Sequence, residues 1–101
     1  MVRVVATIHV KEGHLDEFIG IFKSNVPNVL AEGGCIEYVP NIDLPTGLPR
    51  QELDSNVVTL TEKWRSLEDL QAHLASPHMA AYQKKAKDFV HKVTLKILTE
   101  A

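Results

Sequence analysis

The sequence predicts an α+β fold in which a four-stranded antiparallel sheet carries helices on one of its faces. Stretches that alternate between apolar and polar residues, as half-buried strands do, occur four times along the chain. Stretches with apolar residues at every third or fourth position, typical of amphipathic helices, follow the first and the third of them. The resulting order is β-α-β-β-α-β, which is that of a ferredoxin-like layer.

The first half of the chain has the pattern of a strand, a helix and a second strand. Residues 2–10, VRVVATIHV, alternate, and residues 15–29 repeat apolar side chains at helical spacing. Pro27 lies inside this helical pattern and predicts a kink or a brief break about two residues before it. The stretch EGG at 32–34 is expected to end the helix with a glycine in the left-handed conformation. A second strand is predicted at about 35–43.

A long connection follows at residues 44–56, LPTGLPRQELDSN, with two Pro and one Gly. A structureless connection of this length is uncommon in a small domain and is often functional. A disordered hairpin tip explains the composition equally well, so the sequence leaves both interpretations open.

The second half has the pattern of a strand, an interrupted helix and a last strand. Residues 57–65, VVTLTEKWR, form the predicted third strand. The stretch SLED provides a capping box that starts a helix at residue 66. The stretch SP at 76–77 restarts it, with Ser as the cap and Pro in the first turn. The last strand is predicted at 91–99, HKVTLKILT.

The face of the sheet that bears no helix is expected to be partly apolar. Its residues are Val5, Thr7, Val57, Thr59, Thr61 and Leu98. Exposed patches of this kind often mark a surface for a partner. Dimerisation through this face is compatible with the pattern but is not compelled by it, because Lys63, Lys92 and Lys96 share the face.

Composition limits the classes of function that need to be considered. A chain of 101 residues fits one domain, spanning 1–101, and its net charge of −2 gives no basic surface for nucleic acid. No apolar run approaches the ~18 residues of a membrane span, and the start lacks the pattern of a signal peptide. Cys35 is the single cysteine and cannot form an intrachain disulfide, so a cytoplasmic location is expected.

One segment, EKWRSLEDLQAHLASPHMAAY at 62–82, concentrates the residues that can carry chemistry. It contains the only Trp and two of the five His residues. Glu62 falls on the strand face expected to point inward, where a carboxylate must be paired, protonated or next to a wet cavity. Fraying of the strand end into solvent is the alternative. Trp64 shares this face, and a large aromatic there is ordinarily a core residue.

The helical part of this segment adds two imidazoles and a phenol. His73 borders the apolar stripe of its helix, where a lone His is more often a packing residue than a catalyst. His78 and Tyr82 are four residues apart and are therefore neighbours on one helix face. Together with Glu62 and Trp64, these side chains are expected to surround the space between sheet and helices.

The sequence predicts no metal site and no nucleotide cofactor. His73 and His78 are five residues apart across the SP break, which is not the spacing of a helical zinc pair, and no thiolate cluster supports them. Glycine-rich phosphate loops, dinucleotide fingerprints and nucleophile elbows are absent from the sequence.

The stretch VVTLTEKWRSLEDLQAHLASPHMAAY resembles the signature of the antibiotic biosynthesis monooxygenase superfamily. The likeness extends over the chain through KEGHLDEF and VPNVLAEGGCIEYVPNID, and it is greatest to the quinol monooxygenase branch, where VP, EGGC, EKW, AHL and SPHM have near matches. The resemblance implies a homodimer with facing sheets and a pocket between sheet and helices in each subunit. It also implies oxidation of a small quinol or phenolic substrate by dioxygen, without flavin, haem or metal.

By the same resemblance, Trp64, His73 and His78 are at the catalytic motif positions. Tyr38 and Tyr82 are implied to form the pocket wall. The branch that degrades haem places a Trp about where His73 stands and an iron-ligating His near Gln83, so haem degradation is not expected here. Two alternatives remain open: an isomerase or other enzyme acting on a small carbonyl compound in the same pocket, and a dimer that binds a hydrophobic molecule without catalysis.

The expected chemistry is removal of a phenolic proton by a histidine. Moving a proton from a phenol with a pKa near 10 to an imidazole with a pKa near 6.5 costs ~5 kcal/mol in water. The attraction between imidazolium and phenolate in a poorly solvated pocket offsets part of this cost. His73 is the preferred base and His78 the second choice, with Tyr38, Tyr82 and Glu62 as substrate-binding residues.

Overall fold

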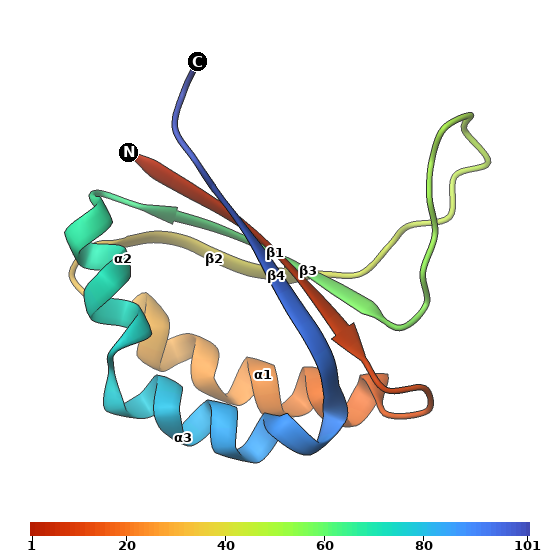
Figure 1. The fold of residues 1–101 in the computed structure, drawn as a ribbon, viewed down its shortest axis with the longest axis horizontal. Coiled ribbons are helices and arrows are strands. Elements are labelled where there is room, and N and C mark those ends of the chain that lie inside the picture. Colours follow the sequence, from red (N-terminus) through yellow and green to blue (C-terminus); the bar gives the residue numbers. More distant parts are fainter.

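The computed structural model describes residues 1–101 and places a four-stranded sheet against one layer of helices (Figure 1). The elements are β1 (Val2–Val10), α1 (Leu15–Leu30), β2 (Cys35–Asn41), β3 (Val57–Trp64), α2 (Leu67–Leu74), α3 (Pro77–Ala86), a short 3-10 turn (Lys87–Phe89) and β4 (Val90–Leu98). The predicted order is confirmed, and the SP stretch divides the second helical region into α2 and α3.

The sheet has the strand order β2-β3-β1-β4, and every neighbouring pair is antiparallel. At its centre, Ala6 of β1 lies opposite Leu60 of β3 on one side and Leu95 of β4 on the other. This is the ferredoxin-like arrangement, with the first and third strands in the middle. The inward residues of β1 are therefore almost fully buried, at 2–3% exposure for Val4, Ala6, Ile8 and Val10.

The helices do not cover the sheet evenly. Helix α1 packs against α3 and β2, while α2 contacts β3, so the helical layer lies toward the β2 side. The inward row of β4 remains about half exposed, at 52%, 49% and 52% for Val93, Leu95 and Ile97. An apolar opening is thus left between α3 and the edge strand β4.

Helix α1 runs through Pro27 without the break that was one of the two predicted effects of this proline. It ends at Leu30, followed by Ala31 in the right-handed conformation. The expectation that EGG supplies a left-handed residue is wrong, because Gly33 and Gly34 both lack a positive φ.

Gly34 has a different function in the fold. A Cβ atom added there would collide with the side chain of Asp69. That side chain belongs to the N-terminus of α2, where the Asp69 backbone N–H donates to the capping Ser66 Oγ at 3.1 Å. Gly34 therefore lets the α1–β2 connection approach the start of α2 closely.

The connection between β2 and β3 projects away from the helices (Figure 1). Its own side chains hold its path, since Gln51 Nε2 donates to the Leu44 carbonyl at 2.7 Å and the Asp54 N–H donates to Asp43 Oδ2 at 2.9 Å. Of the two interpretations of this loop, a disordered tip does not describe the structure. Its large apolar side chains Leu44, Leu48 and Leu53 are exposed.

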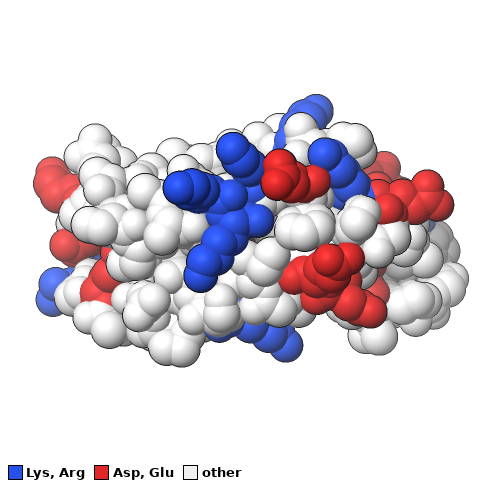
Figure 2. Space-filling model, turned by 90° about the horizontal axis from the view of Figure 1, so that it is seen from below, with Lys and Arg blue, Asp and Glu red and all other residues white.

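The helix side of the molecule shows charges of both signs (Figure 2). Lys84, Lys85 and Lys87, near the end of α3, are exposed, as expected of a solvated helix face. None of the helices combines the length and the apolar character needed to cross a membrane.

The close approach at Gly34 yields a stability prediction. Replacing Gly34 with Ala forces the Asp69 side chain to move and disturbs the cap of α2, so we expect a loss of about 1–3 kcal/mol in the free energy of unfolding. Gly33→Ala is the matched control, because only Arg65 Nη2 lies near its added Cβ, at 3.9 Å. Urea unfolding of both variants measures the difference, and equal stabilities would contradict this role of Gly34.

Candidate active site

The cavity that holds most of the predicted site residues, called the main cavity below, lies between the inward face of the sheet and α3 and has a volume of about 320 Å³. A pocket of about 350 Å³ beside the β2–β3 connection contains none of these residues. The volume of the main cavity is at the lower end of the ~300–1,000 Å³ typical of small-molecule pockets. Twelve of its sixteen lining residues are hydrophobic. Tyr38, Glu62 and His73 are buried and mark its inner end, whereas Lys87 and Leu95 are exposed and mark its mouth. The cavity is therefore an apolar slot with polar groups at its closed end.

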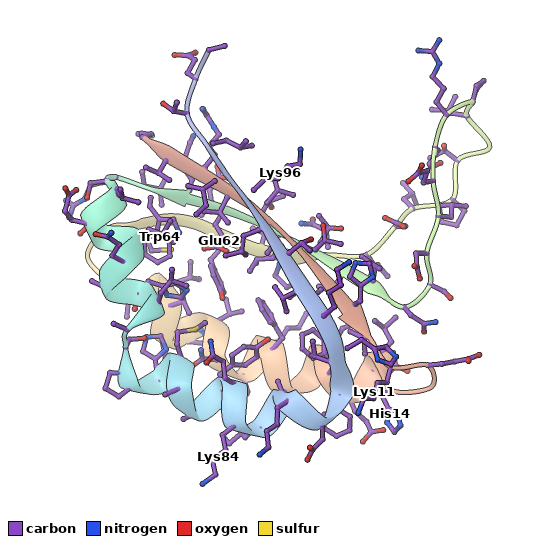
Figure 3. All side chains as sticks on the ribbon, viewed as in Figure 1. Lys11, His14, Glu62, Trp64, Lys84 and Lys96 are labelled. Carbon is purple, nitrogen blue, oxygen red and sulfur yellow. The ribbon has the colours of Figure 1, made fainter.

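Glu62 and Trp64 point from β3 toward the helices, while Lys96 lies on the opposite side of the sheet (Figure 3). Trp64 Nε1 donates a hydrogen bond of 2.9 Å to Glu62 Oε1. Burial raises the pKa of Glu62; the bond from Trp64 opposes this rise, and the charge of Glu32 adds to it. The inward carboxylate expected from the strand alternation is thus present, paired on one oxygen and next to the cavity.

Trp64 itself does not line the cavity. The sequence predicts Trp64 among the side chains around the space between sheet and helices, but the side chain is completely buried and is absent from the cavity wall. Its ring centroid lies 4.6 Å from that of His73 with a tilt of 36°, so it packs behind the imidazole. Trp64 therefore supports Glu62 and His73 and does not form the wall that a ligand would touch.

His73 projects from α2 into the inner end of the cavity and is 2% exposed. Its Nδ1 lies 2.8 Å from Glu32 Oε2. No fully buried side-chain nitrogen or oxygen lacks a partner, so Nε2, which has none within the protein, must be open to the cavity. Burial lowers the pKa of His73, and the hydrogen bond and charge of Glu32 partly offset that effect. The imidazole is therefore biased toward its neutral form, with a free nitrogen facing the slot.

His78 does not reach this cavity. Its Nε2 lies 3.0 Å from Glu32 Oε1, and its ring lines a separate polar groove of about 130 Å³ between α1 and α3. Thus the two predicted histidines bind opposite oxygens of one carboxylate but face different spaces. Of the two, only His73 has access to the main cavity.

Glu32 is a site residue that was not predicted from the sequence. It follows α1 and lies 41 and 46 positions from the two histidines that it contacts. A single glutamate after a helix carries no local signal of such a partnership, so only the packing of α1 against the later helices shows it.

Tyr38 and Tyr82 both line the cavity. Tyr38 lies opposite Glu62 in the β2–β3 register and stacks on Phe22, with ring centroids 5.6 Å apart. Burial raises the pKa of Tyr38 far above its ordinary value and raises the pKa of Tyr82 to about 12. Both hydroxyls are therefore protonated at neutral pH and available as hydrogen-bond donors.

Cys35 lies beside this inner end, opposite Trp64 in the β2–β3 register. Burial, followed by the charges of Glu32 and Glu62, raises the pKa of the thiol to about 11. No group of three or more His, Cys, Asp or Glu side chains is arranged to hold a metal ion.

Comparison with known proteins assigns this architecture to a family. The sequence profile of the family described as "Antibiotic biosynthesis monooxygenase" matches residues 1–85. The chain belongs to this family, whose name defines it as a family of monooxygenases. It is 35% identical over 100 residues to the "Probable quinol monooxygenase YgiN" of Escherichia coli K12, covering 97% of this chain and 96% of that protein.

Solved structures agree on the fold. A conserved protein from Methanosarcina mazei superposes with a TM-score of 0.85 at 25% identity, covering 99% of this chain and 92% of that one. An antibiotic biosynthesis monooxygenase superposes with a TM-score of 0.84 at 18% identity, covering 100% and 99%. The ferredoxin-like fold predicted from the sequence is confirmed by these neighbours.

The buried Glu62 yields a pH-dependent prediction. Because its pKa is raised on folding, the folded state pays for ionisation as the pH rises above the ordinary glutamate value of ~4.3. Glu62→Gln keeps an oxygen that can accept from Trp64 Nε1 and removes this penalty. We expect the variant to gain stability relative to the unaltered protein as the pH rises from 4 to 8, with little difference at pH 4.

Unfolding by urea at a series of pH values measures this effect. Glu37→Gln, on an exposed position of β2, is the control for the loss of one carboxylate. A stability difference for Glu62→Gln that does not grow with pH would contradict the raised pKa.

Proposed function

We propose that this protein is a cofactor-independent monooxygenase that oxidises a small quinol or phenol with dioxygen. The observation that carries the proposal is the free Nε2 of His73 at the closed end of an apolar cavity that Glu62 and Tyr38 also line. The similarity to a protein described as a quinol monooxygenase supports the substrate class.

The overall reaction balances without an added reductant. One quinol and one dioxygen give a hydroxyquinone and water, so one oxygen atom enters the ring and the other leaves as water. The quinol supplies all the electrons that dioxygen takes up. The protein's tasks are then to remove a proton, to hold the resulting anion and to keep water from the radicals that follow one-electron transfer to dioxygen.

His73 is the proposed base. Its lowered pKa leaves a neutral imidazole at pH 7, and its Nε2 has no competing partner in the protein. The carboxylate of Glu32 on the other side of the ring stabilises the imidazolium that forms when a phenolic proton is taken. His78, which was the second choice from the sequence, lacks access to the cavity.

The other polar groups of the cavity hold the substrate. Tyr38 and Tyr82 donate hydrogen bonds to the developing phenolate oxygen, since both hydroxyls stay protonated. Glu62, with its raised pKa, donates a proton in a hydrogen bond when it is neutral. Trp64 acts from behind His73 and does not stack on the substrate ring.

We also propose that the protein is a homodimer through the helix-free face of the sheet. Val5, Val39 and Leu98 lie on that face, and the last two are 46% and 43% exposed. Pairing of two such faces would remove this apolar area from water.

The enzymatic proposal predicts dioxygen uptake with a reduced naphthoquinone above the spontaneous rate. His73→Ala should lower this catalysed rate by about 100-fold or more, because it removes the general base. His91→Ala is the matched control, since His91 is exposed on β4 and lies outside the cavity. A Clark electrode measures the rates under constant illumination and pH.

Binding without catalysis is tested in the same samples. Trp64 is the only Trp and packs on His73, so its fluorescence is expected to change when the quinol enters. A fluorescence change without enhanced dioxygen uptake would favour the binding protein over the monooxygenase. An isomerase would alter the substrate without consuming dioxygen.

The dimer proposal predicts a mass in solution of twice the 11.3 kDa chain. Thr59→Arg introduces a charge near the centre of the helix-free face and should give the monomer mass. Lys84→Glu, on a side chain that points away from the body below α3 (Figure 3), should leave the dimer intact. Light scattering after gel filtration distinguishes these results, and a monomer for the unaltered chain would reject the proposal.

A further inference from the structure

We infer that Glu32 is the positioning residue of His73. We also infer that Asn25 determines which nitrogen of His78 carries the proton and therefore that His78 donates its hydrogen bond to Glu32. The inference deepens the proposed function, because it assigns the residues that prepare the base. Glu32 lines neither the main cavity nor the groove beside His78, and it lies between the two imidazoles.

The carboxylate of Glu32 joins three helices. It follows the end of α1, its Oε2 lies 2.8 Å from His73 Nδ1 on α2, and its Oε1 lies 3.0 Å from His78 Nε2 at the start of α3. An ionised carboxylate only accepts hydrogen bonds. Each imidazole must therefore present an N–H to it, and the Nε2 of neutral His73 is left as an acceptor.

Asn25, His78, Glu32 and His73 form a chain of hydrogen bonds. The direction of these hydrogen bonds is set at Asn25. Asn28 Nδ2 donates to Asn25 Oδ1 at 3.0 Å, and Asn25 Nδ2 donates to Met79 Sδ at 3.5 Å. This orientation of the Asn25 amide places its NH₂ group 3.3 Å from His78 Nδ1, which must then accept. The proton of neutral His78 is thus on Nε2, where it donates to Glu32.

The same chain determines what His73 can do. With Nδ1–H committed to Glu32, the lone pair of Nε2 faces the cavity and is ready for a substrate proton. Because Asn25 directs the N–H of His78 toward Glu32 Oε1, Glu32 Oε2 remains available to the imidazolium of His73. The residues that prepare the base therefore reach from the polar groove between α1 and α3 to the closed end of the cavity.

A purely structural role for Glu32 has to be distinguished from positioning, because the carboxylate also ties α1 to α2 and α3. Glu32→Gln separates them. An amide has one acceptor and one donor side, so it cannot accept from both imidazoles. When its NH₂ faces His73, the proton of that ring moves to Nε2, and the nitrogen that faces the substrate loses its lone pair.

The test compares Glu32→Gln with Glu17→Gln. Glu17 accepts from His14 in an exposed pair of 2.9 Å and serves as the matched control for loss of any His–Glu contact. We expect Glu32→Gln to lower kcat for a reduced naphthoquinone by about 100-fold or more with a small change in KM, and Glu32→Asp to restore part of the rate. Glu17→Gln should leave kcat unchanged.

Two further readouts respond to positioning and not to stability. The titratable groups around His73 are Glu32, His78, Tyr38 and, at the same end of the cavity, Glu62; of these, Glu32 is the one whose charge and hydrogen bond raise the pKa of His73. Its removal lowers the pKa of His73, so the acidic limb of the kcat/KM profile should move to lower pH. Nitrogen-15 NMR should show His73 with its proton on Nδ1 in the unaltered protein and on Nε2 in Glu32→Gln.

Asn25→Asp tests the far end of the chain. A carboxylate there accepts from His78 Nδ1 and adds a proton to that ring, so His78 competes for the charge of Glu32. We expect a smaller loss of kcat than for Glu32→Gln, together with an NMR signal of His78 protonated on both nitrogens.

The outcomes separate this inference from the proposed function. A variant Glu32→Gln that is less stable but keeps kcat, the pH profile and the Nδ1–H form of His73 would overturn the positioning role and leave the monooxygenase proposal intact. If the unaltered protein oxidises no quinol, the proposed function fails, while the NMR measurement still decides whether Glu32 holds the His73 proton on Nδ1.

Discussion

A carboxylate inside a small protein needs a donor that stays in place, and here the indole of Trp64 supplies it to Glu62. Both residues lie on the inward face of β3, two positions apart, so the strand itself sets their distance. Once Trp64 is fixed in this way, its ring provides the surface on which His73 packs. The closed end of the cavity therefore depends on one hydrogen bond within one strand.

The open end of the cavity has a different origin, in the uneven cover of the sheet. Because the helices lie toward β2, the inward apolar row of β4 forms one side of the mouth and is left half exposed. The slot is thus polar at β3, which the helices cover, and apolar at β4, which they leave half exposed.

Local patterns in the sequence predicted the element order and the inward direction of Glu62, because strand alternation and helix periodicity are properties of neighbouring residues. They did not predict that Trp64 packs behind His73 or that His78 faces another groove, since these depend on how α2 and α3 sit on the sheet. Glu32 and Gly34 were missed or misread for the same reason. Their contacts, to His73 and Asp69, join segments that are far apart in the chain.

The environment of Cys35 makes its thiol slow to react with oxidants. With a thiol pKa of about 11, only about one molecule in ten thousand carries the thiolate at pH 7. Peroxide attacks the thiolate and not the thiol, and sulfenic acid is the first product of that attack. Burial, with a smaller contribution from the charges of Glu32 and Glu62, thus protects the single sulfhydryl from oxidation.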